Sequence, residues 1–591
     1  MGMAEASTGR DAFHASSGGA RFELAAEVQR STPRSELDQA LADLDAHKHE
    51  WVELPLRERI ALLDELTRGL LAVSERWVRA SVKAKGIPET STRTGEEWGG
   101  VSVVLRLVRL LRKTLVAIER DGAPRLPGRV ESGPDGQLVV PVFPQDAYDR
   151  IFHSGLSASI WLEPGVTRQA LDAEIAAAYR GARPAGKVAL VLGAGNFASL
   201  APGDALYKLF CELQVVVLKT NPVNAYLGPL IEEAFEALVR RGFLRVVAGG
   251  AEEGAYLAAD RRVAELHLTG SDKTYDAIVF GAGDEGQRRR AARSPVIGKR
   301  FTAELGNVSP LIVVPGPWSE SDIDYQAEHI ASTLAMNAGF NCLSTRVVIQ
   351  HAAWPQRRAL LDAVGDFFAR TPTRTAYYPG AQRIHDAFVA AHPEARRFGD
   401  TQAGHLPWTL ISGLDPDRPD EMCFRREAFC SLFAETALEA PSPAEFIDAA
   451  VGFANEKLWG TLTATLLVHP RSLADSAVKA AVERAVARLR YGTVGVNVWG
   501  AMGFLLTTPS WGAYPGHPPH DIQSGTGTVN NTLMLPRVQK SVLRGPFRTF
   551  PKHPIFSSHR TTPELFRRMA HFEADPALRR LPAILLAAMR G

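Results

Sequence analysis

Residues 188–198 read Val-Ala-Leu-Val-Leu-Gly-Ala-Gly-Asn-Phe-Ala, a short apolar run that stops at a glycine-rich turn. A run of this length bounded by Gly is typical of a buried strand. The turn fits G-x-G-x-x-A, in which the backbone can approach a pyrophosphate at the start of a helix. Further apolar runs follow with helical segments between them, at 215–218, 245–247 and 265–268. Strands that alternate with helices predict a parallel, doubly wound α/β sheet.

A second series of apolar strands lies further along the chain, at 311–314, 345–349, 463–467 and 493–497. We therefore predict two α/β lobes in succession. Upstream of both, apolar residues spaced by threes and fours predict amphipathic helices over 56–77 and 103–118. The second helix carries Arg and Lys on its other side. We favour a solvated basic face on a core helix over a helix lying on a membrane surface.

Length and composition bound the class of protein. The chain has 591 residues, of which 45% are apolar and 22% charged, so disordered, collagen-like and coiled-coil proteins are excluded. The net charge of +2 argues against a nucleic-acid-binding surface over the whole protein. Residues 536–591 are the exception, because they hold 11 Lys and Arg against three acidic residues.

Cysteine usage and the N-terminus predict the compartment. The four cysteines form no CxxC pair, so we expect neither a disulfide scaffold nor a metal site. We expect the protein to reside in a reducing cytoplasm. Residues 1–37 begin with a stretch rich in Ala, Gly and Ser, which predicts a disordered lead and not a signal peptide. No run reaches the ~18 apolar residues of a transmembrane helix. We predict a soluble cytoplasmic protein.

Two turns could contact a nucleotide. An ordinary dinucleotide fold has Asp or Glu at the end of its second strand, whereas here the strand ends in Lys219. The first glycine turn is therefore either a chance turn or part of a different nucleotide geometry. Thr269-Gly270-Ser271 follows another strand and precedes a helix. Its N–H groups and hydroxyl suit phosphate oxygens, and a plain Ser cap of the helix is the alternative.

Two residues are candidates for chemistry. Glu304 lies between apolar neighbours, so it could be a general base with a raised pKa, although a solvated turn Glu is the commoner explanation. Cys342 lies in Asn337-Ala-Gly-Phe-Asn-Cys342, just before a strand. A turn dense in Asn and Gly can supply N–H groups that stabilise a thiolate. The other three cysteines lack such surroundings, so Cys342 is the candidate nucleophile.

In order, these segments resemble the aldehyde dehydrogenase superfamily over roughly residues 38–535. Seven stretches carry the resemblance: Asn196-Phe197, Lys219, Thr269-Gly270-Ser271, Glu304-Leu-Gly-Asn-Val-Ser-Pro310, Asn337-Ala-Gly-Phe-Asn-Cys342, Glu427-Ala-Phe429 and Gly492-Thr-Val-Gly-Val-Asn497. The fold that this implies has two doubly wound lobes, one Rossmann-like and one catalytic, with an oligomerisation arm.

The resemblance implies oxidation of a small-molecule aldehyde to a carboxylate. Cys342 would attack the carbonyl, and the Asn196 amide would hold the oxyanion together with the Cys342 N–H. Hydride transfer would give a thioester, and Glu304 would activate the water that hydrolyses it.

The resemblance also implies which residues bind NAD or NADP. Lys219 would contact the adenosine ribose, Gly270 and Ser271 the pyrophosphate, and Glu427 and Phe429 the nicotinamide ribose and ring.

Departures from the family pattern leave alternatives open. Pro222 stands where many NAD-preferring relatives carry Glu, so NADP is possible. Glu304 favours hydrolysis over acyl transfer to coenzyme A, which is the main alternative; a non-catalytic binding or assembly protein on the same fold is the other. Aromatic residues at Trp499, Phe504 and Trp511 suggest an apolar aldehyde.

The resemblance implies a division of the chain and a homodimer or homotetramer. We expect a lead at 1–37, a cofactor-binding domain at 38–300 interrupted by an arm near 138–165, a catalytic domain at 301–510, a return to the arm at 511–535 with a late strand near 525–535, and a basic C-terminal extension at 536–591. We expect the extension to pack on an acidic surface of the body or of another subunit, with membrane-surface contact as the alternative.

Overall fold

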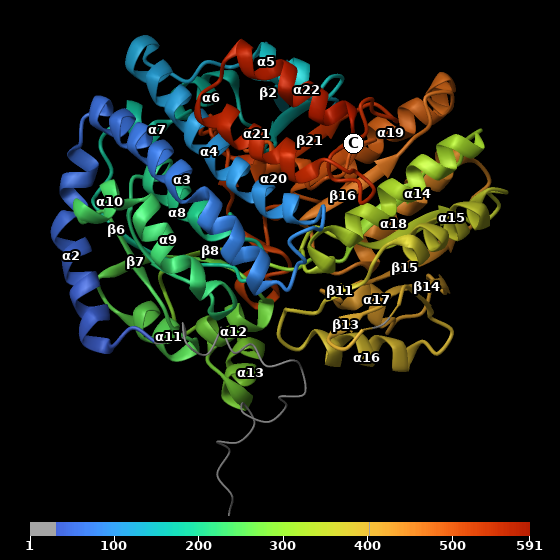
Figure 1. Cartoon of the computed structure of the whole chain (residues 1–591), viewed down its shortest axis with the longest axis horizontal. Coiled ribbons are helices and arrows are strands. Elements are labelled where there is room, and N and C mark those ends of the chain that lie inside the picture. The colour runs from blue at the N-terminus through green and yellow to red at the C-terminus, as the bar shows by residue number, and fades with distance from the viewer. Residues whose placement is uncertain (1–30, 401) are drawn as a thin grey trace, which may run out of the picture.

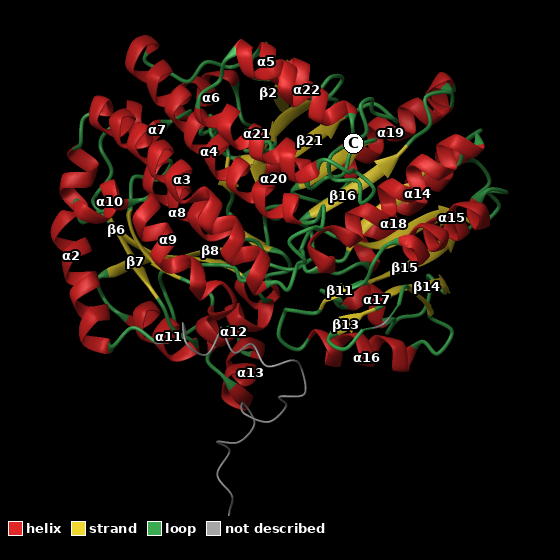
Figure 2. Ribbon diagram, viewed as in Figure 1, coloured by secondary structure: helices red, strands yellow, loops and turns green. Residues whose placement is uncertain are grey.

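The computed structural model describes residues 31–400 and 402–591, and these form two α/β lobes (Figure 1). Each lobe has a largely parallel sheet between helices (Figure 2). The predicted α/β class and the two lobes are confirmed. Residues 1–30 of the predicted lead lie outside the described residues, and helix α2 already begins at Arg34.

The first lobe is built on a six-stranded sheet in the order β19-β8-β7-β4-β5-β6. Its strands are β4 (Val188–Leu192), β5 (Val215–Lys219), β6 (Leu244–Val247), β7 (Val263–Thr269), β8 (Arg300–Glu304) and β19 (Gly525–Thr526). All pair in parallel except β19, which is antiparallel to β8. Every residue of β4 and β5 is buried, as expected for a parallel sheet covered on both faces.

Helices surround this sheet on both sides. They are α2 (Arg34–Glu53), α3 (Leu56–Ala84), α4 (Thr94–Asp121), α8 (Leu200–Phe210), α9 (Gly228–Ala234), α10 (Glu236–Arg240), α11 (Ala251–Ala259), α12 (Asp272–Phe280) and α13 (Gly283–Ala291).

The second lobe has an eleven-stranded sheet in the order β1-β2-β3-β21-β17-β16-β9-β10-β15-β14-β12. Its parallel centre consists of β9 (Ser309–Val313), β10 (Thr345–His351), β14 (Trp408–Leu414), β15 (Leu432–Leu438), β16 (Thr463–Leu467) and β17 (Thr493–Val496), and β12 (Arg396–Phe398) closes one edge. Its helices are α14 (Glu320–Ala335), α15 (Arg357–Arg370), α16 (Ala381–Ala391), α17 (Met422–Arg425), α18 (Pro443–Lys457), α19 (Ser476–Arg488) and α20 (Met502–Leu505).

The arm strands belong to this same sheet. They are β1 (Glu131–Ser132), β2 (Leu138–Phe143), β3 (Ser157–Leu162) and β21 (Val538–Arg544), with α5 (Ala147–Phe152), α6 (Arg168–Glu174) and α7 (Ala177–Arg180) beside them. Strand β21 pairs in parallel with β17 and antiparallel with β3. The predicted late strand near 525–535 was therefore placed too early, because β21 lies inside the segment assigned to the extension. The arm pairs with the sheet of its own chain, and the predicted homo-oligomer stays a prediction.

The basic face of helix α4 is not fully solvated, contrary to our expectation. Arg106 is only 6% exposed, and its guanidinium donates to Asp149 Oδ1 at 2.9 Å and to Glu573 Oε1 at 3.1 Å. Arg109 donates to Glu573 Oε2 at 2.6 Å. Arg106 and Arg109 are thus covered by the chain that follows β21, whereas Lys113 on the same face is exposed as expected.

We call residues 545–591 the C-terminal cap. It contains α21 (Thr562–Ala574) and α22 (Leu581–Met589), and α21 packs along α4, as the red and blue helices of Figure 1 show. The expected contact with acidic residues of the body is confirmed at exposed pairs such as Arg567 with Glu75. It is wrong for the buried anchor, where Glu573 of the cap meets arginines of the body.

No helix of the described residues is both long and apolar enough to cross a membrane.

Candidate active site

The candidate residues gather at the carboxyl ends of the first lobe's strands. Asn196 follows β4, Lys219 ends β5, Gly270 follows β7 and Glu304 ends β8. These strands are neighbours and parallel, so their carboxyl ends meet at one edge of the sheet. Ligands of open α/β sheets bind at this edge.

Cys342 reaches this edge from the second lobe. It lies in the turn between the 3₁₀ helix Met336–Gly339 and β10. Its Sγ donates to Glu304 Oε1 at 3.4 Å. The two lobes therefore place a thiol and a carboxylate in direct contact.

Glu304 has the properties of a general base. It is 2% exposed, and its Oε2 is buried without a hydrogen-bond partner. Burial raises the pKa of Glu304 to about 7, and the negative charge of Asp204 contributes to this rise. A carboxyl with a pKa near neutrality can exchange protons at physiological pH.

The pKa of the Cys342 thiol lies well above its usual range. Burial is the main cause, and the carboxylates of Glu304 and Glu427 add to it. The thiol is therefore protonated before substrate arrives, and its proton is directed at Glu304.

Asn196 lines the same cavity as Cys342, and hydrogen bonds hold its side chain in place. Its side-chain Nδ2 donates to the Phe340 carbonyl at 2.9 Å, and its backbone carbonyl accepts from Asn337 Nδ2 at 2.8 Å. An amide nitrogen carries two hydrogens, so one remains for another acceptor. Asn196, Glu304 and Cys342 all line one cavity of about 20 Å³, which we call the catalytic cavity.

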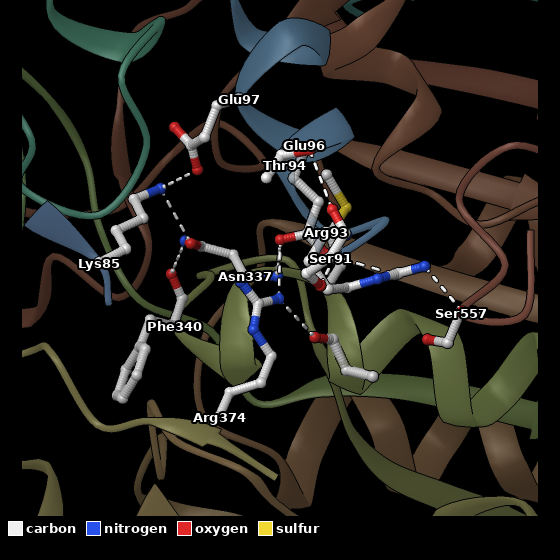
Figure 3. A network of polar contacts seen from close by, with 12 residues as sticks. Lys85, Ser91, Arg93, Thr94, Glu96, Glu97, Asn337, Phe340, Arg374 and Ser557 are labelled. Carbon is white, nitrogen blue, oxygen red and sulfur yellow. Dashed lines mark hydrogen bonds and ion pairs between the residues drawn. The ribbon is translucent and has the colours of Figure 1, made fainter. Parts of the chain in front are cut away.

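Asn337 organises the turn that carries Cys342 (Figure 3). Its backbone is left-handed, with φ of 52°, and its Oδ1 accepts from Lys85 Nζ at 3.0 Å. The buried Lys85 also donates to Glu97 at 2.7 Å. A buried cation with two protein partners braces this turn.

A second ion group continues the network towards the C-terminal cap. Glu96 accepts from the Asn337 N–H at 3.1 Å and from Arg374 at 2.8 Å. Arg93 pairs with Glu96 at 3.4 Å and donates to the Ser557 carbonyl of the cap at 2.7 Å. The catalytic turn and the cap are thus joined through one carboxylate, as Figure 3 shows.

The departures from the family pattern have local explanations. Phe340, where the family has Gln, is buried against Tyr377, with ring centroids 4.9 Å apart. Asn307 donates to Ser309 at 2.9 Å and to the Thr463 carbonyl at 3.0 Å, so it braces the start of β9. Neither side chain lines the catalytic cavity.

The adenosine end of the predicted cofactor site has a buried cation. Burial lowers the pKa of Lys219 to about 8, an effect that Glu253 at the start of α11 partly offsets. Lys219 Nζ donates only to the Thr220 carbonyl, at 3.3 Å, among the side-chain contacts described. Its remaining N–H groups suit ribose hydroxyls.

The pyrophosphate position is an exposed helix start. Ser271 caps α12, and its Oγ accepts from the Thr274 N–H at 3.1 Å. Gly270 is exposed beside it. The first backbone N–H groups of a helix have no partner within the helix and favour an anion.

Glu427 and Phe429 lie on the second lobe, towards the same edge. Burial raises the pKa of Glu427 to about 7, against the opposing charge of Arg346. Its Oε1 is buried and has no partner, and a side chain at Gly306 would collide with its carboxylate. Glu427 therefore has a free acceptor oxygen next to a glycine that leaves room for a ligand, and this arrangement fits a ribose hydroxyl. Phe429 packs at 5.0 Å from Tyr378, between ring centroids.

The carboxylate of Glu427 contributes to the raised pKa of the Cys342 thiol, so the charge of Glu427 acts on the thiol. Five of the eight predicted residues therefore lie at or just after strand ends of the first lobe, namely Asn196, Lys219, Gly270, Ser271 and Glu304. Cys342 contacts Glu304, and Glu427 lies beside Gly306. The described residues fit NAD or NADP in donors and acceptors.

Asp204 and Lys85 escaped prediction. Asp204 is buried on α8 and accepts from Thr269 Oγ1 at 2.7 Å. The helix is largely apolar, and no sequence motif around Asp204 indicates a function for it. Lys85 and its partner Glu97 lie on helices whose pattern indicates only amphipathicity. Their mutual spacing of 12 residues gives no local signal.

One buried group elsewhere resembles a metal site. His392, Glu421 and Cys423 lie close together. Glu421 Oε1, however, already accepts from the Cys423 N–H and faces His392 Nε2, each at 2.9 Å. The carboxylate is satisfied within the protein, so this group does not revise the expectation that no metal is required.

Comparison with known proteins places the fold. Residues 172–367 match the sequence model of the Aldehyde dehydrogenase family. An N-succinylglutamate 5-semialdehyde dehydrogenase from Sphingopyxis alaskensis is 30% identical over 168 residues, which are 28% of this chain and 32% of that protein. The chain therefore spans about a third of the length of this relative.

Solved structures match over most of the chain. An NADP-dependent glyceraldehyde-3-phosphate dehydrogenase from Bacillus halodurans, complexed with NADP, is 16% identical with a TM-score of 0.56, covering 87% of this chain and 92% of that one. A variant of aldehyde dehydrogenase C from Pseudomonas syringae, in complex with NAD⁺ and octanal, is 16% identical with a TM-score of 0.58, covering 88% and 91%. At these identities the likeness is one of fold.

Proposed function

We propose, from the premise that this chain carries an aldehyde dehydrogenase family domain within that family's fold, that it oxidises an aldehyde to a carboxylate with NAD or NADP. The observation that carries the proposal is the contact of 3.4 Å between Cys342 Sγ and Glu304 Oε1, in a cavity that Asn196 also lines.

The reaction begins with loss of the thiol proton to Glu304. Glu304 is buried, Cys342 is partly buried, and the two side chains are in contact, so the proton moves over one hydrogen bond. Sulfur then bonds to the aldehyde carbon, and the carbonyl electron pair moves to oxygen. The second hydrogen of Asn196 Nδ2 and the Cys342 N–H donate to that oxyanion.

Oxidation follows when the oxyanion re-forms its carbonyl and the C–H electron pair departs as hydride. NAD or NADP, when bound, would supply the acceptor for that hydride. Lys219, Ser271 and Glu427 would hold the cofactor by its ribose hydroxyls and pyrophosphate. The chain retains a thioester on Cys342.

Hydrolysis closes the cycle. Glu304 returns its proton to solvent and then takes one from a water molecule, which attacks the thioester carbon. The C–S bond breaks, and Glu304 passes the proton taken from water to the departing sulfur, which restores the thiol. The carboxylic acid loses its own proton to solvent and leaves as the carboxylate. A base with a pKa near 7 suits both proton transfers, because neither protonation state is strongly favoured at neutral pH.

The proposal is tested by following NAD(P)H absorbance with a panel of aldehydes, each cofactor, and with or without coenzyme A. We expect turnover without coenzyme A and its loss in Cys342→Ala. Strict dependence on coenzyme A would replace the hydrolytic reaction by acyl transfer. Absence of turnover and of cofactor binding in every arm would instead favour a non-catalytic protein on this fold.

A further inference from the structure

A cavity much larger than the catalytic cavity lies beneath the C-terminal cap. We call it the cap chamber: a space of about 480 Å³ lined by α4, residues 151–156, residues 497–506, and cap residues between 545 and 588. Ligand pockets of proteins span roughly 300–1,000 Å³, so this volume suits a small molecule.

The cap chamber adjoins the catalytic cavity. Both are lined by four of the same side chains: Phe197, Met336, Trp499 and Leu505. The residues that would bind the cofactor, such as Lys219 and Glu427, line neither the chamber nor the shared wall. A molecule in the chamber would thus approach Cys342 past the shared wall and not past these residues.

Its lining is mainly apolar. Cap side chains include Phe556, Leu565, Phe566, Met569, Ile584 and Leu585. The charged groups at the wall already have protein partners: Arg106 is paired with Asp149 and Glu573, and Arg93 with Glu96. Paired charges offer little to a charged ligand.

Three histidines of the lining are held neutral. Burial lowers the pKa of His153 and His329 to about 4 and that of His553 to about 3. The arginines and histidines around them strengthen this effect for His153 and His553. At neutral pH these rings add no charge to the chamber.

Exposed apolar side chains concentrate around the same region. Six large ones are exposed among the described residues: Ile151, Val296, Phe550, Leu578, Leu586 and Met589. All except Val296 lie on α5 or on the C-terminal cap, and Ile151 and Phe550 line the chamber itself. An apolar tail therefore meets apolar side chains at the chamber's edge.

We propose that the cap chamber receives the apolar tail of the aldehyde, so that the C-terminal cap makes this enzyme selective for long, uncharged, unbranched aldehydes. The inference rests on the proposed function, because the reacting carbonyl must lie at Cys342 while the tail extends past the shared wall. It deepens that function by naming the class of substrate and the segment that selects it.

The first test is a series of straight-chain aldehydes from propanal to dodecanal. Burial of one methylene favours binding by about fourfold, so kcat/KM should rise by about that factor per carbon until the chamber is filled. A flat series, or a maximum at propanal, would overturn the inference.

Two cap variants should move the preference in opposite directions. Ala588→Trp fills the chamber and should lower kcat/KM for dodecanal by about tenfold or more while propanal changes less than twofold. Met569→Ala enlarges it and should shift the preferred length upward. A folding defect cannot produce opposite shifts. Arg568→Ala is the matched control, since Arg568 pairs with Glu564 on the exposed side of α21 and does not line the chamber.

A binding experiment separates this inference from the proposed function. Dodecan-1-ol is titrated calorimetrically into Cys342→Ala and into Cys342→Ala/Ala588→Trp. Binding that the second substitution abolishes supports the chamber. Binding without turnover of any aldehyde by the wild type would refute the proposed oxidation and leave the chamber as an apolar-tail site. Turnover without binding, and without a chain-length effect, would refute the chamber and keep the oxidation.

Discussion

The catalytic cavity and the cap chamber share four side chains and are built in opposite ways. The catalytic cavity measures about 20 Å³ and takes Asn196, Glu304 and Cys342 from strand ends and a tight turn. The cap chamber measures about 480 Å³ and takes its walls from α4, the arm and the C-terminal cap.

The difference separates chemistry from selectivity. Bond-making groups must be placed within a few tenths of an ångström, so they lie on rigid elements with short sequence motifs around them. An apolar wall only needs shape and hydrophobicity, so many sequences can build it and no motif marks it. Each substitution below should affect one cavity and spare the other.

The largest effect is expected at the nucleophile. Cys342→Ala should lower kcat for every aldehyde by at least about a thousandfold, since no step can begin without the thiol. Affinity for dodecan-1-ol in the cap chamber should stay unchanged. Residual turnover within tenfold of the wild type would show that another group carries the reaction.

Glu304→Gln should remove the general base from the same catalytic cavity. Steady-state turnover should fall by about 10²- to 10⁴-fold, with the hydrolytic step most affected. In the wild type, the carboxyl with a pKa of about 7 is protonated below neutrality, so kcat should rise as pH increases through about 7. A pH profile that falls over this range would exclude Glu304 as the base.

The buried anchor of the cap should matter next. Glu573→Gln leaves Arg106 and Arg109 without their shared carboxylate, and breaking a buried pair costs about 3–5 kcal/mol. Hydrogen exchange should show faster local opening of α21, with loss of selectivity for long aldehydes. Glu564→Gln, at an exposed pair on the same helix, is the control and should change neither. An unchanged exchange rate in α21 would contradict the anchor.

Asp204→Asn should produce a smaller effect on the catalytic side. The charge of Asp204 helps to keep the pKa of Glu304 high, so its removal should move the midpoint of the kcat–pH profile to lower pH. The chain-length preference should not change. A midpoint that moves upward would show that Asp204 does not act on Glu304 by charge.

The smallest effect is expected at the cofactor. Glu253 is the carboxylate that acts on Lys219, and a negative charge there disfavours a 2′-phosphate. Glu253→Gln should raise the ratio of NADP to NAD activity by roughly two- to fivefold, the range of a partly exposed charge interaction. An unchanged ratio would exclude Glu253 as a determinant.

The sequence predicted the parts of the molecule that repeat a local pattern. Buried strands such as β4 and β5 read as uninterrupted apolar runs, and the turn before Cys342 carries its own Asn and Gly. Non-local features could not be found this way. Strand β21 pairs with β17 and β3, and its basic residues look like those of a tail until its partners are known.

Charge counting misled for the same reason. The excess of Lys and Arg after residue 536 predicted contact with acids, yet the buried contact uses Glu573, one of three acidic residues there. Net charge averages over a segment, whereas a buried ion pair depends on a single side chain and its partner.

The central claim is that the carbon oxidised is bonded to Cys342. Its most direct test is mass spectrometry of Glu304→Gln, mixed with one aldehyde and cofactor and quenched in acid. Glu304→Gln should slow loss of the thiol proton and slow hydrolysis further. After prolonged incubation we therefore predict one equivalent of NAD(P)H per subunit and an acyl group on the peptide that contains Cys342. NAD(P)H formed with no acyl group on Cys342, or with the acyl group on another residue, would contradict the account.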